Sequence, residues 1–110
     1  MNNKKFNKVT KARVKKCLDV MCRKSEEYAS DTDKLHNFKV AGDLQGCSQI
    51  KALGGMMCKH TVSIYDLIND YEAGKNIPIE LWDEKIGDSI NYLLLLNAMV
   101  IEGQLDKSIK

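Results

Sequence analysis

The sequence predicts an all-α protein, a four-helix bundle-like domain that we expect to be completed by oligomerisation. Three observations favour this fold class. Apolar residues recur at helical spacing in four segments, no stretch alternates apolar and polar residues as a strand does, and most glycines fall between the helical segments. A chain of 110 residues fits one domain, residues 1–110, whose ends at residues 1–8 and 104–110 we expect to be flexible.

The first helix is expected at residues 9–28. Its apolar side is formed by Val14, Cys17, Leu18, Met21, Ser25 and Tyr28. Residues 29–33 then form a turn, in which Thr32 or Asp33 can cap the next helix. This second helix is short, at residues 34–44, and ends at Gly46. It offers the core Leu35, Phe38 and Ala41.

The third helix is expected from Ser48, a suitable N-cap, to about residue 71. Its apolar stripe consists of Ile50, Leu53, Met57, Ile64, Ile68 and Tyr71. Gly54 and Gly55 each cost about 1 kcal/mol inside a helix relative to alanine. They predict a kink, a break, or the close approach of a neighbour or ligand. Gly74 closes the helix, and Pro78 suits the first turn of the next one.

The fourth helix is expected at residues 79–102. Its main apolar face is Trp82, Ile86, Ile90, Leu93 and Val100. Residues 93–96 are apolar on all sides, so this segment is expected to be buried on all sides. Four short helices achieve that most easily by forming a dimer through this segment.

Charge is distributed unevenly along the chain. Residues 1–24 carry nine Lys or Arg and one acid, a net charge of +8, whereas the remaining residues carry −6. The basic first helix could attract nucleic acid or nucleotide phosphates. The alternative is a solvated helix face without a partner.

The composition indicates a cytoplasmic protein. No apolar segment of a secretory signal follows the first residues, and the longest apolar run, residues 93–96, is far too short to span a membrane. The four cysteines do not have the spacing of a zinc-ligand pair. We interpret them as small core residues in a reducing compartment.

Two carboxylates on the fourth helix are the strongest candidates for chemistry. Glu84 and Asp88 lie one turn apart, with side chains about 6 Å from each other. Asn91 and Tyr92 lie on the same side of the helix, away from its main apolar face. Farther along the helix this side is apolar. Such a pair can hold Mg²⁺, or Mn²⁺, together with water and substrate phosphates. The alternative is a pair of exposed acids near a helix N-terminus.

A second polar line on the third helix consists of Lys59, Ser63, Asp66 and Asp70. Lys59 could bind a phosphate and Asp66 could supply a further metal oxygen, although a solvated face gives the same pattern. His60, beside the apolar stripe, is better interpreted as a core-edge residue than as a ligand.

Three further residues are weaker candidates. His36 and Asn37, at the start of the second helix, could bind a base edge or a sugar, because they are donors and acceptors at neutral pH. Glu27 could add a carboxylate to a shared site. There is no P-loop, no Gly-x-Gly-x-x-Gly and no nucleophile elbow, so any phosphate binding would come from a metal and from cationic side chains.

Four segments, at residues 24–29, 35–38, 57–66 and 84–92, together resemble small phage-encoded proteins grouped with the MazG-like all-α nucleoside triphosphate pyrophosphatases. The resemblance covers roughly residues 20–102. Its most specific part is the last segment, where an acid-rich turn with Glu84 and Asp88 is followed by Asn91-Tyr92 and a leucine run.

This resemblance implies a helical bundle that assembles as a dimer or tetramer and binds nucleotide. It also implies Mg²⁺-dependent cleavage of a nucleoside or deoxynucleoside triphosphate to a monophosphate and pyrophosphate. Carboxylates on two adjacent helices hold the metal in that family, and Glu84 and Asp88 match its last acidic motif.

The chain departs from the family pattern at Lys85, where an acid is usual, and at Ser63-x-x-Asp66, where Glu-x-x-Glu is usual. Three alternatives therefore stay open. They are a nucleotide-binding relative without catalysis, a rearranged metal site that uses Glu27, and a helical module that binds nucleic acid or another partner through the basic first helix.

Overall fold

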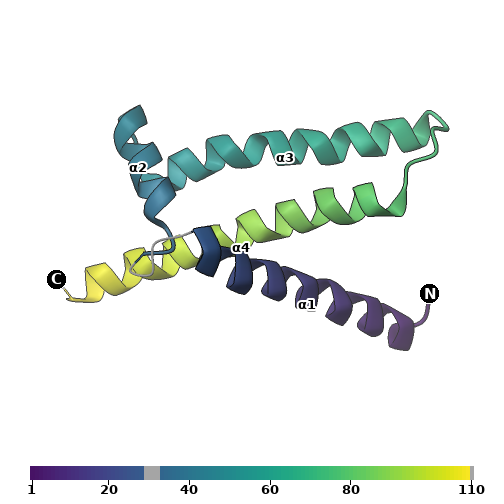
Figure 1. Ribbon diagram of the computed structural model, residues 1–110, viewed down its shortest axis with the longest axis horizontal. Helices are drawn as coiled ribbons and strands as arrows, with labels where there is room; N and C mark the ends of the chain where they lie inside the picture. Colours follow the sequence, from purple (N-terminus) through teal and green to yellow (C-terminus); the bar gives the residue numbers. More distant parts are fainter. Residues whose placement is uncertain (29–32, 110) are drawn as a thin grey trace. The chain divides into compact units, whose positions relative to one another are not determined.

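The computed structural model of the chain consists of four helices (Figure 1). It describes the backbone of residues 1–28 and 33–109, and the side chains of residues 1–22 and 33–104. The helices are α1 (Asn3–Tyr28), α2 (His36–Gln45), α3 (Gln49–Glu72) and α4 (Ile79–Ile109). No β-strand occurs in the described ranges, which confirms the all-α prediction. The chain divides into two compact units, Met1–Lys34 and Leu35–Lys110.

Helix α1 begins at Asn3, six residues earlier than expected. The side-chain Oδ1 of Asn2 accepts the backbone N–H of Lys5 at 2.9 Å, which caps the first turn. Lysine is a good helix former, so the capped helix extends through the lysine-rich start of the chain. Residues 3–8, expected to be a flexible end, are therefore helical. At the other end α4 continues to Ile109, beyond the expected boundary at residue 102.

Helix α2 begins at His36, and its N-cap is Leu35, which makes no side-chain capping bond. The expectation that Asp33 caps this helix is therefore wrong, and Thr32 lies outside the described residues. The buried Leu35 side chain anchors this end of the helix instead, while its carbonyl accepts the first helical hydrogen bonds. Gly46 ends the helix as predicted, with φ 68° in the left-handed region that glycine adopts most readily.

Helix α3 is capped by Ser48, whose hydroxyl accepts the backbone N–H of Lys51 at 3.1 Å, as predicted. The helix runs without a break through Gly54 and Gly55, and a Cβ added at either would meet nothing within 4 Å. No break and no close neighbour in the described chain therefore accompanies the two glycines. The helix ends before Gly74, at φ 83°, also as predicted.

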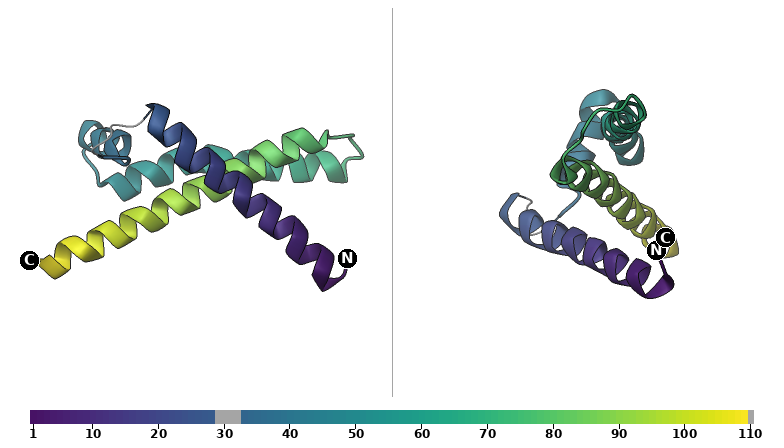
Figure 2. Two further views of the ribbon diagram at one scale, coloured as in Figure 1. Left: turned by 60° about the horizontal axis from the view of Figure 1, so that its bottom comes forward. Right: turned by 90° about the vertical axis from the view of Figure 1, so that its right-hand side faces the viewer.

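Within the second unit, α3 and α4 form an antiparallel pair joined by residues 73–78, and α2 packs against α3 (Figure 1). Figure 2 shows that α3 and α4 cross as they pack. A core cluster of Leu35, Leu53 and Met99 holds one residue from the α2 N-cap, one from α3 and one from α4. The partly buried apolar residues packed against this cluster are Phe38, Met57, Tyr92, Leu95 and Leu96.

The face that α4 turns toward α3 differs from the expected one. Ile86, Leu93 and Val100, which were expected to face the core, are 37%, 54% and 46% exposed. The polar line of Asp88 and Tyr92 faces α3 instead, because it continues into the buried Met99. The stripe expected on α3 is confirmed in part, because Leu53 is buried and Met57 packs against the core cluster. Its other members Ile50, Ile68 and Tyr71 are exposed.

At the other end of the α3–α4 pair, Tyr71 and Trp82 meet edge to face across the connecting turn. Their ring centroids lie 6.4 Å apart with an interplanar angle of 72°. This contact closes the end of the pair that is remote from the core cluster.

The four cysteines differ in burial. Cys17 is buried and Cys47 is partly buried, but Cys22 and Cys58 are exposed, so the interpretation of all four cysteines as core residues is wrong. All four are free thiols. Among the described residues, no helix combines the length and the apolar character needed to cross a bilayer.

The corner between α2 and α3 yields a test of the packing. A Cβ at the buried Gly42 would lie 2.7 Å from the Cys47 carbonyl oxygen and 3.1 Å from the Gln49 backbone nitrogen, neither of which can rotate away. Gly42→Ala should lower the free energy of unfolding by about 1–3 kcal/mol. The matched control Gly55→Ala, with open space around the new methyl group, should raise it by up to about 1 kcal/mol. Urea unfolding followed by circular dichroism measures both free energies. A Gly42→Ala protein as stable as the wild type would contradict the close packing of Gly42 against the backbone of residues 47–49.

Candidate functional site

The candidate site lies where α4 faces α3, and its centre is a histidine–carboxylate pair. The Nδ1 atom of His60 on α3 lies 3.7 Å from Oδ2 of Asp88 on α4. The His60 side chain is 16% exposed and that of Asp88 is 38% exposed, so the pair sits at the edge of the packed interface. The structure thus brings a predicted metal ligand to a histidine that sequence reasoning had assigned to the core edge.

Tyr92 connects this pair to the core. One turn beyond Asp88, its ring lies against the His60 ring with centroids 4.6 Å apart and a tilt of 38°. On another side Phe38 of α2 meets it edge to face at 6.3 Å. Tyr92 also packs against the core cluster, so the position of the His60 ring is set by apolar packing. Tyr92, which was predicted to bind substrate, therefore has a structural role in this interface.

Two side-chain oxygens on the same stretch of α4 are buried without a hydrogen-bond partner in the described chain, Oδ1 of Asn91 and Oγ of Ser89. Leaving a buried acceptor unpaired costs about 1–3 kcal/mol, so such an atom is usually satisfied by water or by a ligand. Asn91 was predicted to contact substrate. Ser89 was missed, because a serine inside a helix carries no distinguishing sequence signal.

Glu84, the other predicted catalytic carboxylate, has a different environment. Its side chain is 61% exposed, and its Oε1 lies 4.0 Å from Nζ of Lys85, which is 28% exposed. Lys85 is the residue that departs from the family pattern, and it places a positive charge beside this carboxylate. Glu84 and Asp88 therefore share a helix and a sign of charge, but they do not share the packed interface.

The polar residues of α3 separate into two groups. Lys59 and Asp66 are exposed, and helical geometry places them about 100° and 120° around the axis from His60. Ser63 donates its hydroxyl to the Lys59 carbonyl oxygen at 2.9 Å, a bond within its own helix. In the part of the chain whose side chains are described, no three His, Cys, Asp or Glu residues are grouped so as to hold a metal ion. The structure does not join Asp66 to Asp88.

The remaining predicted residues lie at the margin. His36 and Asn37 are exposed at the start of α2, immediately before Phe38, whose contact with Tyr92 brings this end of α2 toward the candidate site. Glu27 belongs to the last turn of α1, where side chains lie outside the described residues.

Comparison with known proteins returned no relatives: no protein-family model, no curated protein and no solved structure matches this chain.

The role of Tyr92 in positioning the site can be measured as stability. Tyr92→Ala removes a ring that contacts His60, Phe38 and the core cluster, and should lower the free energy of unfolding by about 2–4 kcal/mol. Tyr65→Ala is the matched control, because Tyr65 on α3 is 62% exposed and should change stability by less than about 0.5 kcal/mol. Equal effects in chemical denaturation would show that the Tyr92 ring is not packed as described.

Proposed function

We propose that this chain is a cytoplasmic, Mg²⁺-dependent nucleotide pyrophosphohydrolase that converts a nucleoside or deoxynucleoside triphosphate to a monophosphate and pyrophosphate. The observation that carries the proposal is the Asp88 carboxylate, turned toward α3 beside His60 and Tyr92. Both sides of this contact belong to the segments that resemble the MazG-like family, residues 57–66 and 84–92.

The donor set is compatible with Mg²⁺, although it is a small one. Mg²⁺ commonly uses one or two carboxylates and takes water and substrate phosphates as its other ligands. Asp88 and Glu84 would supply these carboxylates, and the unpaired Oδ1 of Asn91 is a further oxygen on the same stretch of helix. Glu27, whose side chain lies outside the described residues, remains proposed as an additional ligand, and Asp66 could join this set only if α3 turned its exposed side toward Asp88. When bound, the metal would offset phosphate charge and activate the attacking water.

The order of residues along α4 suggests how a nucleotide would be oriented. Glu84 and Asp88 form an acidic end, and Tyr92, eight residues beyond Glu84 or about 12 Å along the axis, forms an aromatic end. Phosphates with their metal would lie at the first end and the base at the second, where it could stack on an aromatic ring. His36 and Asn37 approach the same aromatic end through the contact of Phe38 with Tyr92. They would supply neutral hydrogen-bonding groups for a base or sugar.

Lys59 is the cation that we assign to the phosphates. It is exposed, and it lies on α3 about 100° around the helix axis from His60. No ion pair involves its side chain among the described residues. Its ammonium group is thus available to an anionic ligand.

The active form is proposed to be a dimer or tetramer. Leu95 and Leu96 pack against the core cluster, whereas Leu93 and Leu94 are 54% and 41% exposed. The all-apolar segment is therefore covered on one side only, which supports an interface on the other. Further exposed apolar residues of α3 and α4 are Val62, Tyr65, Ile68, Ile86, Val100 and Ile101.

A second candidate function is nucleotide binding without hydrolysis. The observation that favours it is the Lys85 ammonium group, whose Nζ lies 4.0 Å from Oε1 of Glu84. This positive charge offsets negative charge that a metal site needs. Nucleotide affinity without release of pyrophosphate would identify this alternative.

The hydrolase proposal is tested by Asp88→Asn, which keeps the shape of the side chain and removes its charge. Pyrophosphate release from a panel of ribo- and deoxynucleoside triphosphates with Mg²⁺ should fall by orders of magnitude, because the metal loses a carboxylate ligand. Calorimetric titration with Mg²⁺ or Mn²⁺ should lose its heat in parallel.

Asp43→Asn is the charge-matched control for this experiment, since Asp43 is exposed on α2 and outside the candidate site. It should retain wild-type activity. If the wild type releases pyrophosphate and Asp88→Asn does so equally fast, the site is misassigned. If the wild type shows neither release nor metal binding in the presence of nucleotide, the enzymatic proposal is rejected.

Lys59→Ala tests the assignment of the phosphate-binding cation. It should weaken nucleotide binding about tenfold or more, because a hydrogen bond to a charged group contributes about 1.5–3 kcal/mol. The melting temperature should change by no more than a few degrees, since the side chain is exposed. Lys51→Ala, also exposed on α3, should leave the affinity unchanged. An affinity that is the same in all three proteins would remove Lys59 from the site.

A further inference from the structure

One side of α1 carries a continuous row of cations. Lys4, Lys8, Lys11 and Lys15, which we call the lysine stripe, fall within an arc of about 60° around the helix axis and span about 16 Å along it. All four side chains are exposed. In the described part of the chain, none of them forms an ion pair. The lysine stripe is therefore a row of positive charges without ion-pair partners in the described residues, held at regular spacing by the helix.

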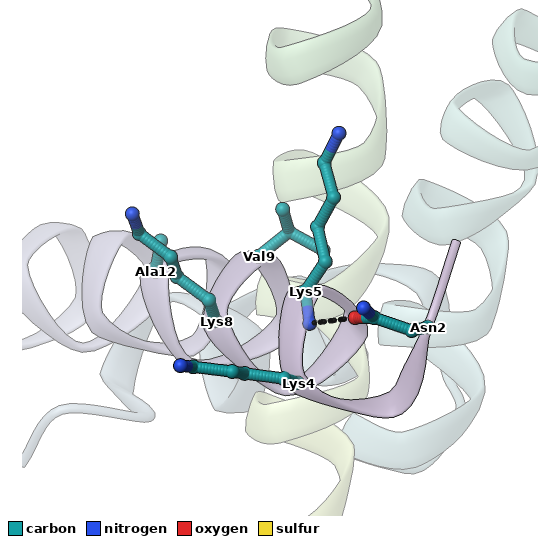
Figure 3. Close-up of a pocket in the computed structure, with 6 residues that line it drawn as sticks. All are labelled: Asn2, Lys4, Lys5, Lys8, Val9 and Ala12. Atoms are coloured by element: carbon teal, nitrogen blue, oxygen red, sulfur yellow. Dashed lines mark hydrogen bonds between the residues drawn. The ribbon is translucent and has the colours of Figure 1, made fainter.

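The start of the stripe is well formed. The Asn2 cap holds the first turn of α1, and Figure 3 shows Lys4 and Lys8 extending from the same side of the helix. Asn2 and five residues of α1 line a hollow of about 580 Å³ there. They include Lys4, Lys5 and Lys8 but no acid.

We propose that the lysine stripe binds the phosphate backbone of nucleic acid without reading its sequence. Duplex DNA carries one negative charge per about 1.7 Å when both strands are counted, so a length of about 16 Å holds roughly nine phosphate charges, more than the four lysines can contact. The attraction is confined to this part of the chain, since residues 1–24 carry +8 and the remainder −6. Asp19 is the single acid in residues 1–24, and it follows the stripe rather than interrupting it.

The residue types of α1 favour nucleic acid over a lipid surface. A helix that lies in a membrane interface typically presents Trp, Phe and Leu opposite its cations. The exposed apolar residues of α1 are mainly valines: Phe6, Val9, Val14, Leu18 and Val20. The stripe consists of lysine alone, which contacts phosphate as a point charge and lacks the paired hydrogen-bonding groups that read base edges. Contacts to the backbone alone are therefore expected.

The proposal is independent of the proposed hydrolase, because it uses none of the residues assigned to the nucleotide. The test measures binding of the full chain to a fluorescein-labelled DNA duplex by anisotropy, between 50 and 200 mM salt. Four phosphate contacts predict a slope of log K against log salt of about −3.6, and a loss of affinity of about 150-fold over that range. The double variant Lys11→Gln/Lys15→Gln should make the slope less steep by about 1.8.

The matched control is Lys16→Gln, which removes one charge from the same helix at a position about 140° around the axis from Lys11. Its slope should equal that of the wild type, whereas Lys11→Gln alone should change the slope by about 0.9. Circular dichroism checks that each variant keeps its helix. If the two single variants change the slope equally, binding depends on the net charge of α1 and not on the lysine stripe, and the proposal is overturned. Absence of binding at 50 mM salt, or tighter binding to phosphatidylserine vesicles than to the duplex, would overturn the nucleic-acid assignment.

Discussion

Burial of three apolar residues, Leu35, Leu53 and Met99, is the constraint on which the candidate site depends. Met99 and Asp88 are eleven residues apart on α4, which places them within about 20° of each other around the helix. Leu53 and His60 are seven residues apart on α3 and are related in the same way. Once Met99 packs against Leu53, the two polar residues are directed toward each other. Apolar packing thus sets a contact whose own Coulomb energy is small at the edge of the interface.

The features that the sequence predicted correctly are those set by local chemistry. Ser48 caps α3 and Gly46 ends α2 because a short hydroxyl side chain and a residue without Cβ suit those positions whatever lies nearby. The rotation of the helices was predicted less well. Counting apolar residues favours the side of α4 that carries Ile86 and Leu93, but the packed side is selected by its fit to α3. The pairing of His60 with Asp88 depends on that rotation, so no spacing rule could reveal it.

The chain offers phosphate groups two different kinds of partner. Around Asp88, one partly exposed carboxylate lies on the same stretch of α4 as two buried neutral oxygens, and a phosphate would be accepted there together with a divalent cation. Along α1, ammonium groups stand in water, and a phosphate would be accepted by direct attraction that salt weakens. The departure at Lys85 is of interest in this light, because it brings a cation into the first environment and moves its charge balance toward that of the second.

The contact of Trp82 with Tyr71 gives the chain a built-in optical probe. Trp82 is the single tryptophan of the sequence, so the indole emission arises entirely from the first turn of α4, where the ring meets Tyr71 at the end of α3. That turn lies at the opposite end of the helix pair from the core cluster. Helical content measured by circular dichroism averages over all four helices, whereas the indole signal follows one junction. If the two signals change at different denaturant concentrations, unfolding that begins at the α3–α4 turn can be distinguished from unfolding of the core cluster.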